Sequence, residues 1–279
     1  MTAEVLPLYP EAGPARPLEG LYLNQRLHTL GSPEDPFVYG NFVSSLDGRI
    51  ALVDAEGTES NVLEGLTSAN DFRLFQELQA QADCLITHGG YLRALSQGRL
   101  GNVLQVGANG DADLIAWRKE AGLAEQPAVV VASGSLNFTV PDSIEAHGQP
   151  FYIATGEMAD PARVEAFKRQ GFELIVAGSG TMVEGARLVQ AVGKLGYKRL
   201  YLLAGPYMLD TMLRDRRLSR LYLTIRHRLL GGEQFHTMIP GPPLGQAGQL
   251  TLRTLYYDQG QSAGEGQWFA QFECPRNAE

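Results

Sequence analysis

The residues best suited to bind a charged ligand lie at a strand-to-helix junction near residue 205. An apolar segment, 199–204, runs without a spacer through Gly205 and Pro206 into an amphipathic segment that reaches Arg214. The free N–H groups of a helix's first turn and the positive end of its dipole favour an anion, and a glycine lets the ligand approach the backbone. Pro206 loses little there, because its missing N–H would have no partner within the helix. The pattern predicts either a phosphate-binding turn or a plain strand-to-helix turn.

Two further segments have turn chemistry of the same kind. Residues 41–45 have a strand pattern that ends in small polar residues and leads into the Asp47-Gly48 turn. Asp47 either binds its own backbone or faces a substrate, and the turn role is favoured because Asp-Gly is a strong turn signal. Gly178–Thr181 also lies between a strand and a helix. It is either a second phosphate turn or a flexible cap without a ligand.

The residue types that metal or nucleophilic catalysis needs do not cluster in the sequence. The histidines lack metal-ligand spacing, Cys84 and Cys274 lie far apart, and there is no Gly-x-Ser-x-Gly motif. We therefore expect no metal site, and we interpret the histidines as structural. Hydride transfer fits this pattern, because it needs binding loops rather than a nucleophilic triad, and no catalytic residue is assigned. The five histidines are His28, His88, His147, His227 and His236.

The composition is that of a chain with a large core and a net negative charge. With 279 residues and 44% hydrophobic content, the chain fits one large domain, which we favour, or two small ones. The net charge of −8 and the pI near 5.2 argue against a nucleic-acid surface. There is no signal peptide and no apolar run of about 18 residues, so we expect a cytoplasmic protein that does not bind membranes.

Strand and helix patterns alternate through most of the chain, as in an α/β layer fold. Ser68 and Asp71 resemble a capping box at the start of one helix, and Asp160-Pro161 opens another. After Gly232 the helical patterns stop, and the later strands are expected to close the sheet in antiparallel fashion. Strands are predicted over 37–43, 84–87, 129–132, 151–154, 172–177, 199–204, 221–225, 236–239, 250–257 and 267–272, and helices over 68–82, 91–95, 113–121, 161–171 and 182–195.

The first 35 residues differ from the rest of the chain. They contain several prolines and no sustained periodicity, so we expect an irregular N-terminal arm over residues 1–35. Its apolar residues need a surface to cover them. The arm either packs across the partner subunit of a homodimer or docks on its parent domain. These apolar residues are Leu18, Leu21, Tyr22, Leu23 and Leu27.

In their order along the chain, these segments resemble the reductase domain of bacterial riboflavin biosynthesis, the 5-amino-6-(5-phosphoribosylamino)uracil reductase family. The likeness runs with gaps from about Pro36 to about Gly232 and includes the turns at 45–48 and 204–206. It implies a three-layer α/β fold like that of the related dihydrofolate reductases, with a mixed, mostly parallel central sheet and an antiparallel C-terminal edge. The reductase domain is then residues 36–279. Other matching segments are Leu66–Ser68, Cys84–Thr87, Val129–Ser133 and Leu229–Gly232.

The resemblance also implies a bound NADPH. It places the pyrophosphate on the Gly-Pro turn and along the first turn of the following helix. It places Ser133 near the adenosine 2′-phosphate, and the backbone of Val43 beside the nicotinamide, with Ser44 and Ser45 continuing that wall. The expected pyrophosphate-binding residues are Gly205, Pro206, Tyr207, Met208 and Thr211.

The substrate side departs from the family pattern. Leu203 stands where the family has an acid, Gln79 where it has an arginine for the substrate phosphate, and Tyr91 where it has a threonine. Leu95-Ser96-Gln97 replaces an Asp-Asp-Pro. Either Arg93 or Arg99 is a possible replacement phosphate contact, although solvated arginines are the commoner outcome. The expected substrate-side residues are Ser45, Asp47, Gln79, Tyr91 and Leu203.

These features predict an NADPH-dependent reductase that transfers hydride to a ribosylaminopyrimidine-like substrate. The four departures keep two alternatives open. One is a reductase of a different pterin, flavin or related heterocycle. The other is a non-catalytic nucleotide-binding module of the same fold. We expect a homodimer with a small-molecule substrate.

Overall fold

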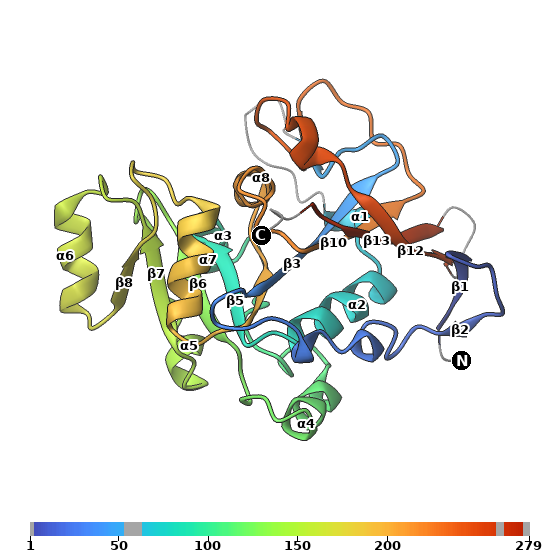
Figure 1. The fold of residues 1–279 in the computed structure, drawn as a ribbon, viewed down its shortest axis with the longest axis horizontal. Coiled ribbons are helices and arrows are strands. Elements are labelled where there is room, and N and C mark those ends of the chain that lie inside the picture. The colour runs from blue at the N-terminus through green and yellow to red at the C-terminus, as the bar shows by residue number, and fades with distance from the viewer. Residues whose placement is uncertain (1–2, 53–62, 261–264, 276–279) are drawn as a thin grey trace.

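One large sheet extends across the molecule (Figure 1). The computed structural model describes residues 3–52, 63–260 and 265–275. Eleven strands pair in the order β2-β1-β12-β13-β10-β3-β9-β5-β6-β7-β8, so β1 and β2 lie at one end and β8 at the other. A separate ribbon pairs β4 (Ala51–Leu52) with β11 (Phe235–His236).

Seven neighbouring strands, from β10 to β8, run parallel, and the remaining four are antiparallel. The central strand β6 is wholly apolar and buried, as expected of a parallel strand that is covered on both faces. The parallel strands are β10 (Arg220–Arg226), β3 (Phe37–Ser45), β9 (Arg199–Leu202), β5 (Cys84–His88), β6 (Ala128–Ala132), β7 (Phe151–Thr155) and β8 (Glu173–Val176), and the antiparallel ones are β13 (Gln267–Glu273), β12 (Thr251–Asp258), β1 (Glu4–Tyr9) and β2 (Arg16–Pro17).

Helices cover both faces of the sheet, which gives the three layers that the sequence predicts. Val38, Ile86 and Leu202 pack toward α7 (Gly185–Lys194) and α8 (Pro206–Arg214). Tyr39, Leu85 and Tyr201 pack on the opposite face with α2 (Ala69–Ala80) and α3 (Gly89–Ser96). The other helices are α1 (Leu63–Leu66), α4 (Ala112–Glu120), α5 (Asp142–Ala146) and α6 (Pro161–Arg169), with 3-10 turns at Leu23–Gln25, Leu27–Thr29 and Gly245–Gly248.

The N-terminal segment is more ordered than predicted. The irregular arm expected over residues 1–35 contains β1, which pairs with β12 and so covers the strand that we expected at the edge of the sheet. Leu18, Tyr22 and Leu27 are buried in the core beside α2. The apolar residues of this segment therefore dock on their own chain, which is one of the two alternatives that the sequence leaves open.

Two side chains hold this segment in place, Glu77 on α2 and Gln81 at the C-cap of that helix. The buried carboxylate of Glu77 accepts hydrogen bonds from the backbone N–H groups of Gly20 at 2.5 Å, Tyr22 at 2.9 Å and Leu23 at 3.4 Å. Gln81 accepts from the N–H of Leu27 at 2.7 Å and donates to the carbonyl of Tyr22 at 2.9 Å. Burial raises the pKa of Glu77, and the N–H bonds oppose that shift.

The helix starts follow the predicted capping chemistry. Asp160 caps α6, with Pro161 in the first turn, and the Ser68 hydroxyl accepts the N–H of Asp71 at 3.0 Å. The Asp71 carboxylate does not return to the Ser68 backbone as a capping box requires. It accepts a hydrogen bond from Thr224 on the sheet at 2.5 Å instead. Among the described residues, no helix combines the length and the apolar character needed to cross a bilayer.

Candidate active site

The candidate site lies where the parallel strands β3, β9, β5 and β6 end. Because parallel strands end at the same edge of a sheet, this edge is a common place for a ligand in α/β proteins. Leu202 pairs with both Gly40 and Ile86, and His88 pairs with Ala132. The register therefore brings the residues that follow these strands to one edge: Val43–Ser45, Leu203–Gly205, His88–Gly90 and Ser133.

The Gly-Pro turn starts α8 in the way that an anion site requires. Gly205 is the N-cap, Pro206 lies in the first turn, and no side chain caps this helix. Side chains of Ser68 and Asp160 do cap α2 and α6. A Cβ at Gly205 would lie 3.5 Å from His88 Nε2, so the missing side chain leaves the helix start open beside that ring.

The pyrophosphate-binding residues expected from the sequence do not all reach this opening. Tyr207 is 75% exposed at the helix start. Met208 is buried in the core, and the Thr211 hydroxyl accepts the N–H of Gly185 at 3.2 Å, which joins α8 to α7. The side chains of Met208 and Thr211 thus pack α8 on its neighbours, which leaves Gly205, Pro206 and Tyr207 at the helix start.

His88 also lies at this edge, although its sequence pattern was interpreted as that of a structural histidine. The residue is the N-cap of α3. A Cβ at Gly90 would lie 2.8 Å from His88 Nδ1, and one at Gly205 would lie 3.5 Å from His88 Nε2. The imidazole therefore lies between the starts of α3 and α8. Its position directly after a buried strand and before two glycines was the signal available in the sequence.

Ser133 ends β6 and is buried against the start of α3. Its hydroxyl accepts the N–H of Leu136 at 3.0 Å, and a Cβ at Gly89 would approach that hydroxyl to 2.8 Å. Two cations border the loop that follows. Arg93 donates to the carbonyl of Asn137, and Arg163 donates to that of Ser135, both at 2.9 Å.

The contacts of Asp47 are those of a residue that stabilises a turn. Its carboxylate accepts hydrogen bonds from the Ser45 hydroxyl at 2.5 Å and from the backbone N–H of Gly231 at 2.9 Å, and it pairs with Arg49. The Ser45 bond and then the Gly231 bond hold the pKa of Asp47 well below its usual range. Ser45 and Asp47 together thus join the end of β3 to the segment that follows β10.

Gln79 and Tyr91 come together through hydrogen bonds to the same loop. Gln79 donates to the carbonyl of Val103 at 2.8 Å. The Tyr91 hydroxyl donates to the carbonyl of Gly101 at 3.0 Å and accepts the N–H of Val103 at 2.9 Å. Both side chains therefore hold residues 101–103 in place, while Leu203 contributes only apolar surface on the same face of the sheet.

The second glycine-rich segment, Gly178–Thr181, is filled by the chain itself. The N–H and the hydroxyl of Ser179 both bind the Glu184 carboxylate, at 2.8 Å and 2.7 Å. A Cβ at Gly178 would lie 1.9 Å from the carbonyl oxygen of Met182. A carboxylate of this chain occupies the place of an external anion, so the geometry is that of a cap without a ligand.

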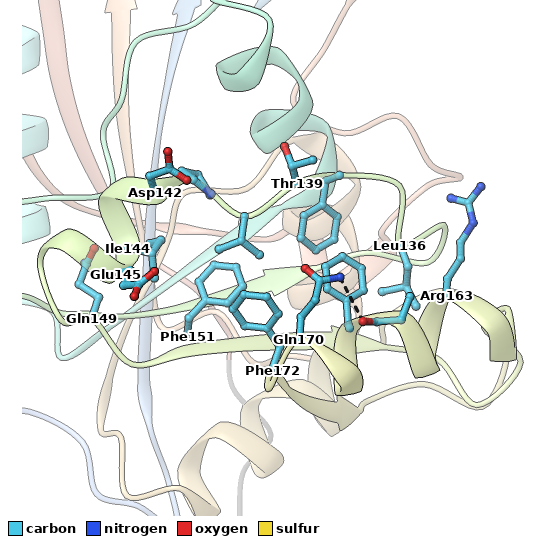
Figure 2. Close-up of a pocket in the computed structure, with 15 residues that line it drawn as sticks. Leu136, Thr139, Asp142, Ile144, Glu145, Gln149, Phe151, Arg163, Gln170 and Phe172 are labelled. Atoms are coloured by element: carbon cyan, nitrogen blue, oxygen red, sulfur yellow. Dashed lines mark hydrogen bonds between the residues drawn. The ribbon is translucent and has the colours of Figure 1, made fainter.

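A large pocket of about 760 Å³ lies elsewhere, between α5 and α6 (Figure 2). Phe151 and Phe172 line its floor, with Asp142 and Glu145 at one end and Arg163 at the other. It shares no lining residue with the strand edge described above. In the part of the chain that the structure describes, no group of three or more histidine, cysteine or acidic side chains is placed to hold a metal ion.

One family of known proteins matches most of the chain. The family model described as the RibD C-terminal domain matches residues 36–260. No curated protein matches the chain.

Three solved structures have the same fold at low sequence identity. A pyrimidine reductase-like protein from Corynebacterium diphtheriae is 18% identical with a TM-score of 0.62, and the match covers 88% of this chain and 94% of that one. The Saccharomyces riboflavin biosynthesis reductase Rib7 is 11% identical with a TM-score of 0.58, covering 92% and 99%. RibD from Acinetobacter baumannii is 15% identical with a TM-score of 0.57, covering 87% of this chain and 59% of that one. The expected dihydrofolate-reductase-like α/β class, with its mixed and mostly parallel sheet, is confirmed.

Proposed function

Because the chain belongs to the RibD C-terminal domain family, we propose that it is a riboflavin-biosynthesis-type reductase that uses NADPH. The observation that carries this proposal is the uncapped start of α8 at Gly205 and Pro206, at the edge where four parallel strands end. Two of the similar structures are named as reductases of pyrimidine or riboflavin biosynthesis type, which supports the reaction class.

The edge of the sheet where these strands end suits a dinucleotide. The first turn of α8 offers N–H groups and the positive end of the helix dipole to the pyrophosphate, and the absence of a Cβ at Gly205 leaves room for it. His88 Nε2 lies beside the same opening, 3.5 Å from the place of a Cβ on Gly205. Arg93 and Arg163 border the loop after Ser133, where a 2′-phosphate would find cations.

The bound cofactor supplies the hydride, so the protein's task is to orient the two reactants and exclude water. The end of β3 at Val43 forms one wall, and the Ser45–Asp47–Gly231 contacts fix the turn that follows it. Leu203 and the aromatic core beneath it keep the α2 face of the site apolar. This arrangement positions a planar acceptor without a nucleophile.

A binding and turnover assay tests the proposal directly. Purified protein should bind NADPH and oxidise it when 5-amino-6-(5-phosphoribosylamino)uracil, a pterin or a flavin is supplied. A protein that binds NADPH but oxidises it with none of these acceptors is the non-catalytic module. Failure to bind NADPH would contradict the whole proposal.

The ribosylaminopyrimidine phosphate is expected to be a poor substrate. Leu203 presents apolar surface, and a substrate donor that faces it loses about 1–3 kcal/mol because it stays unpaired. Leu203→Glu alone should not restore turnover, because Gln79 and Tyr91 are committed to residues 101–103 and contacts to one ligand are not additive. Steady-state assays check this. Turnover of about 1 per second or more would show that other residues replace the missing contacts.

Ser133→Ala is expected to reduce the preference for NADPH over NADH. The substitution removes the hydroxyl that would donate a hydrogen bond to the charged 2′-phosphate of NADPH. The loss should be about tenfold in the ratio of the two dissociation constants. Fluorescence titrations with both nucleotides measure it. Ser135→Ala, an exposed serine in the same loop, is the matched control and should leave the ratio unchanged. Equal affinity of the wild type for NADPH and NADH would remove Ser133 from the site.

We also propose a cytoplasmic homodimer in which residues 36–279 form one reductase domain. The family membership supports this assembly and location, and the core contacts of Leu18, Tyr22 and Leu27 tie the first 35 residues to the same domain. Analytical ultracentrifugation of the purified protein tests the dimer.

A further inference from the structure

The pocket between α5 and α6 has the size of a ligand site, and the proposed reductase reaction does not use it. Its volume of about 760 Å³ lies within the usual range of small-molecule sites, which is about 300–1,000 Å³. The loop that leads into α5, the helix α6 and the first residue of β7 line it (Figure 2). A pocket of this volume suits a small molecule.

Four phenylalanine rings in mutual contact form the floor of this pocket. Phe138 stacks on Phe167 with ring centroids 5.0 Å apart. Phe172 lies edge-on to both Phe167 and Phe151, at 6.1 Å and 5.5 Å. Phe167 is buried, whereas the other three rings are partly exposed. Contiguous apolar surface that stays uncovered marks a binding site, and another flat ring packs well on aromatic side chains.

The free charge in the pocket is negative. Asp142 and Glu145 lie at one end of the row of rings, in the first turn of α5. Both are exposed, and among the described residues neither side chain forms an ion pair or a hydrogen bond. Arg163, at the other end, is already engaged, because it donates to the carbonyl of Ser135 at 2.9 Å and lies 3.7 Å from the Asp160 carboxylate. A complementary ligand therefore carries a positive charge at the α5 end.

Helix stability alone does not account for this arrangement. The dipole of the five-residue helix α5 favours acids in its first turn, which explains each carboxylate by itself. It does not explain the uncovered rings beside them, since apolar surface left in water costs free energy. A ligand that has both a ring and a cation complements the two features together. The net charge of −8 also attracts cations to the protein.

We propose that this pocket binds a small aromatic amine that is protonated at neutral pH. The ring of the amine packs on Phe151 and Phe172, and its ammonium group binds the carboxylates of Asp142 and Glu145. The pocket shares no lining residue with the edge of the sheet proposed for the cofactor. The amine and NADPH therefore bind at separate places, and this inference does not depend on the reductase reaction.

Calorimetric titration with three indole probes tests the assignment, because the probes share one ring and differ in the charge of the side chain. Tryptamine is cationic, tryptophol is neutral and indole-3-acetate is anionic. Tryptamine should bind at least about fivefold more tightly than tryptophol, which is the effect expected of two exposed ion pairs. Indole-3-acetate should bind most weakly. Equal affinity for tryptamine and tryptophol would overturn the proposal.

A double variant identifies the carboxylates that select the cation. Asp142→Asn combined with Glu145→Gln should reduce the affinity for tryptamine to that for tryptophol, and the affinity for tryptophol should not change. Glu125→Gln combined with Glu233→Gln changes the net charge equally at exposed positions outside the pocket. This control should bind tryptamine as the wild type does. An equal loss in both double variants would show that only the general charge of the protein attracts the amine, and would overturn the proposal.

A third variant tests the floor of the pocket. Thr139 is an exposed residue that lines it, and Thr139→Trp should fill the pocket and abolish the binding of all three probes. Circular dichroism checks that the variant is folded. Unchanged tryptamine affinity in this variant would place the amine elsewhere and would overturn the proposal.

Two further outcomes separate this site from other occupants. Saturating NADPH should leave tryptamine bound, and complete displacement by NADPH would place the amine at the edge of the sheet and overturn the proposal. A wild type that binds none of the probes would also overturn it. If Thr139→Trp then dissociates a dimer in sedimentation experiments, a second copy of the chain covers the rings. These outcomes do not require NADPH oxidation, so they are distinguishable from failure of the proposed function.

Discussion

Gly205→Val is expected to weaken NADPH binding at least tenfold, a loss of about 1.4 kcal/mol. Even a single Cβ at this position would lie 3.5 Å from His88 Nε2, and the two methyl groups of valine extend further into the opening at the start of α8. They would occupy the space that the pyrophosphate needs in order to reach the first-turn N–H groups. Equilibrium titration of NADPH fluorescence measures the change, with circular dichroism to confirm that the variant is folded.

Gly180→Val tests which of the two glycine-rich turns binds the cofactor. A Cβ at Gly180 meets nothing within 4 Å, and the Ser179 groups beside it are occupied by Glu184. This variant should bind NADPH as the wild type does. Unchanged affinity in folded Gly205→Val would place the cofactor elsewhere. A loss confined to Gly180→Val would point to the segment after β8.

The fold could be predicted wherever local chemistry and burial agree. The parallel strands β5 and β6 are built mainly from apolar residues, and Ser68 and Asp160 open helices as their side chains predict. The strand β1 was missed because Pro7 interrupts its pattern and because its partner β12 lies at the opposite end of the chain. Strand propensity depends strongly on such distant neighbours.

In the candidate site too, features set by neighbouring residues could be predicted, and features set by distant partners could not. Gly205 and Pro206 were predictable because a strand, a glycine and a helix start are adjacent in sequence. Asp71 was interpreted as a helix cap, since its actual partner, Thr224, is 153 residues away. Gln79 was assigned to the substrate by position alone, whereas the structure commits its amide to Val103, in a poorly periodic stretch whose path the sequence does not reveal.

Glu77→Ala is expected to lower the free energy of unfolding by about 3 kcal/mol, the largest stability effect that we anticipate. The substitution removes a buried carboxylate that accepts backbone N–H groups from Gly20, Tyr22 and Leu23, and it leaves those donors unpaired. The lost side-chain volume adds to the penalty. Chemical denaturation measures the free energy, and for a chain of this size the melting temperature should fall by about 6–12 °C.

Hydrogen exchange locates the effect and distinguishes it from a general loss of stability. The amides of Gly20, Tyr22 and Leu23 should lose protection in Glu77→Ala more than those of the central strands, because their acceptor is gone. Glu120→Ala, an exposed glutamate on α4, is the matched control and should change stability by less than about 0.5 kcal/mol. If Glu77→Ala is no more destabilising than this control, the N-terminal segment is held by its apolar contacts with α2 and not by the buried carboxylate.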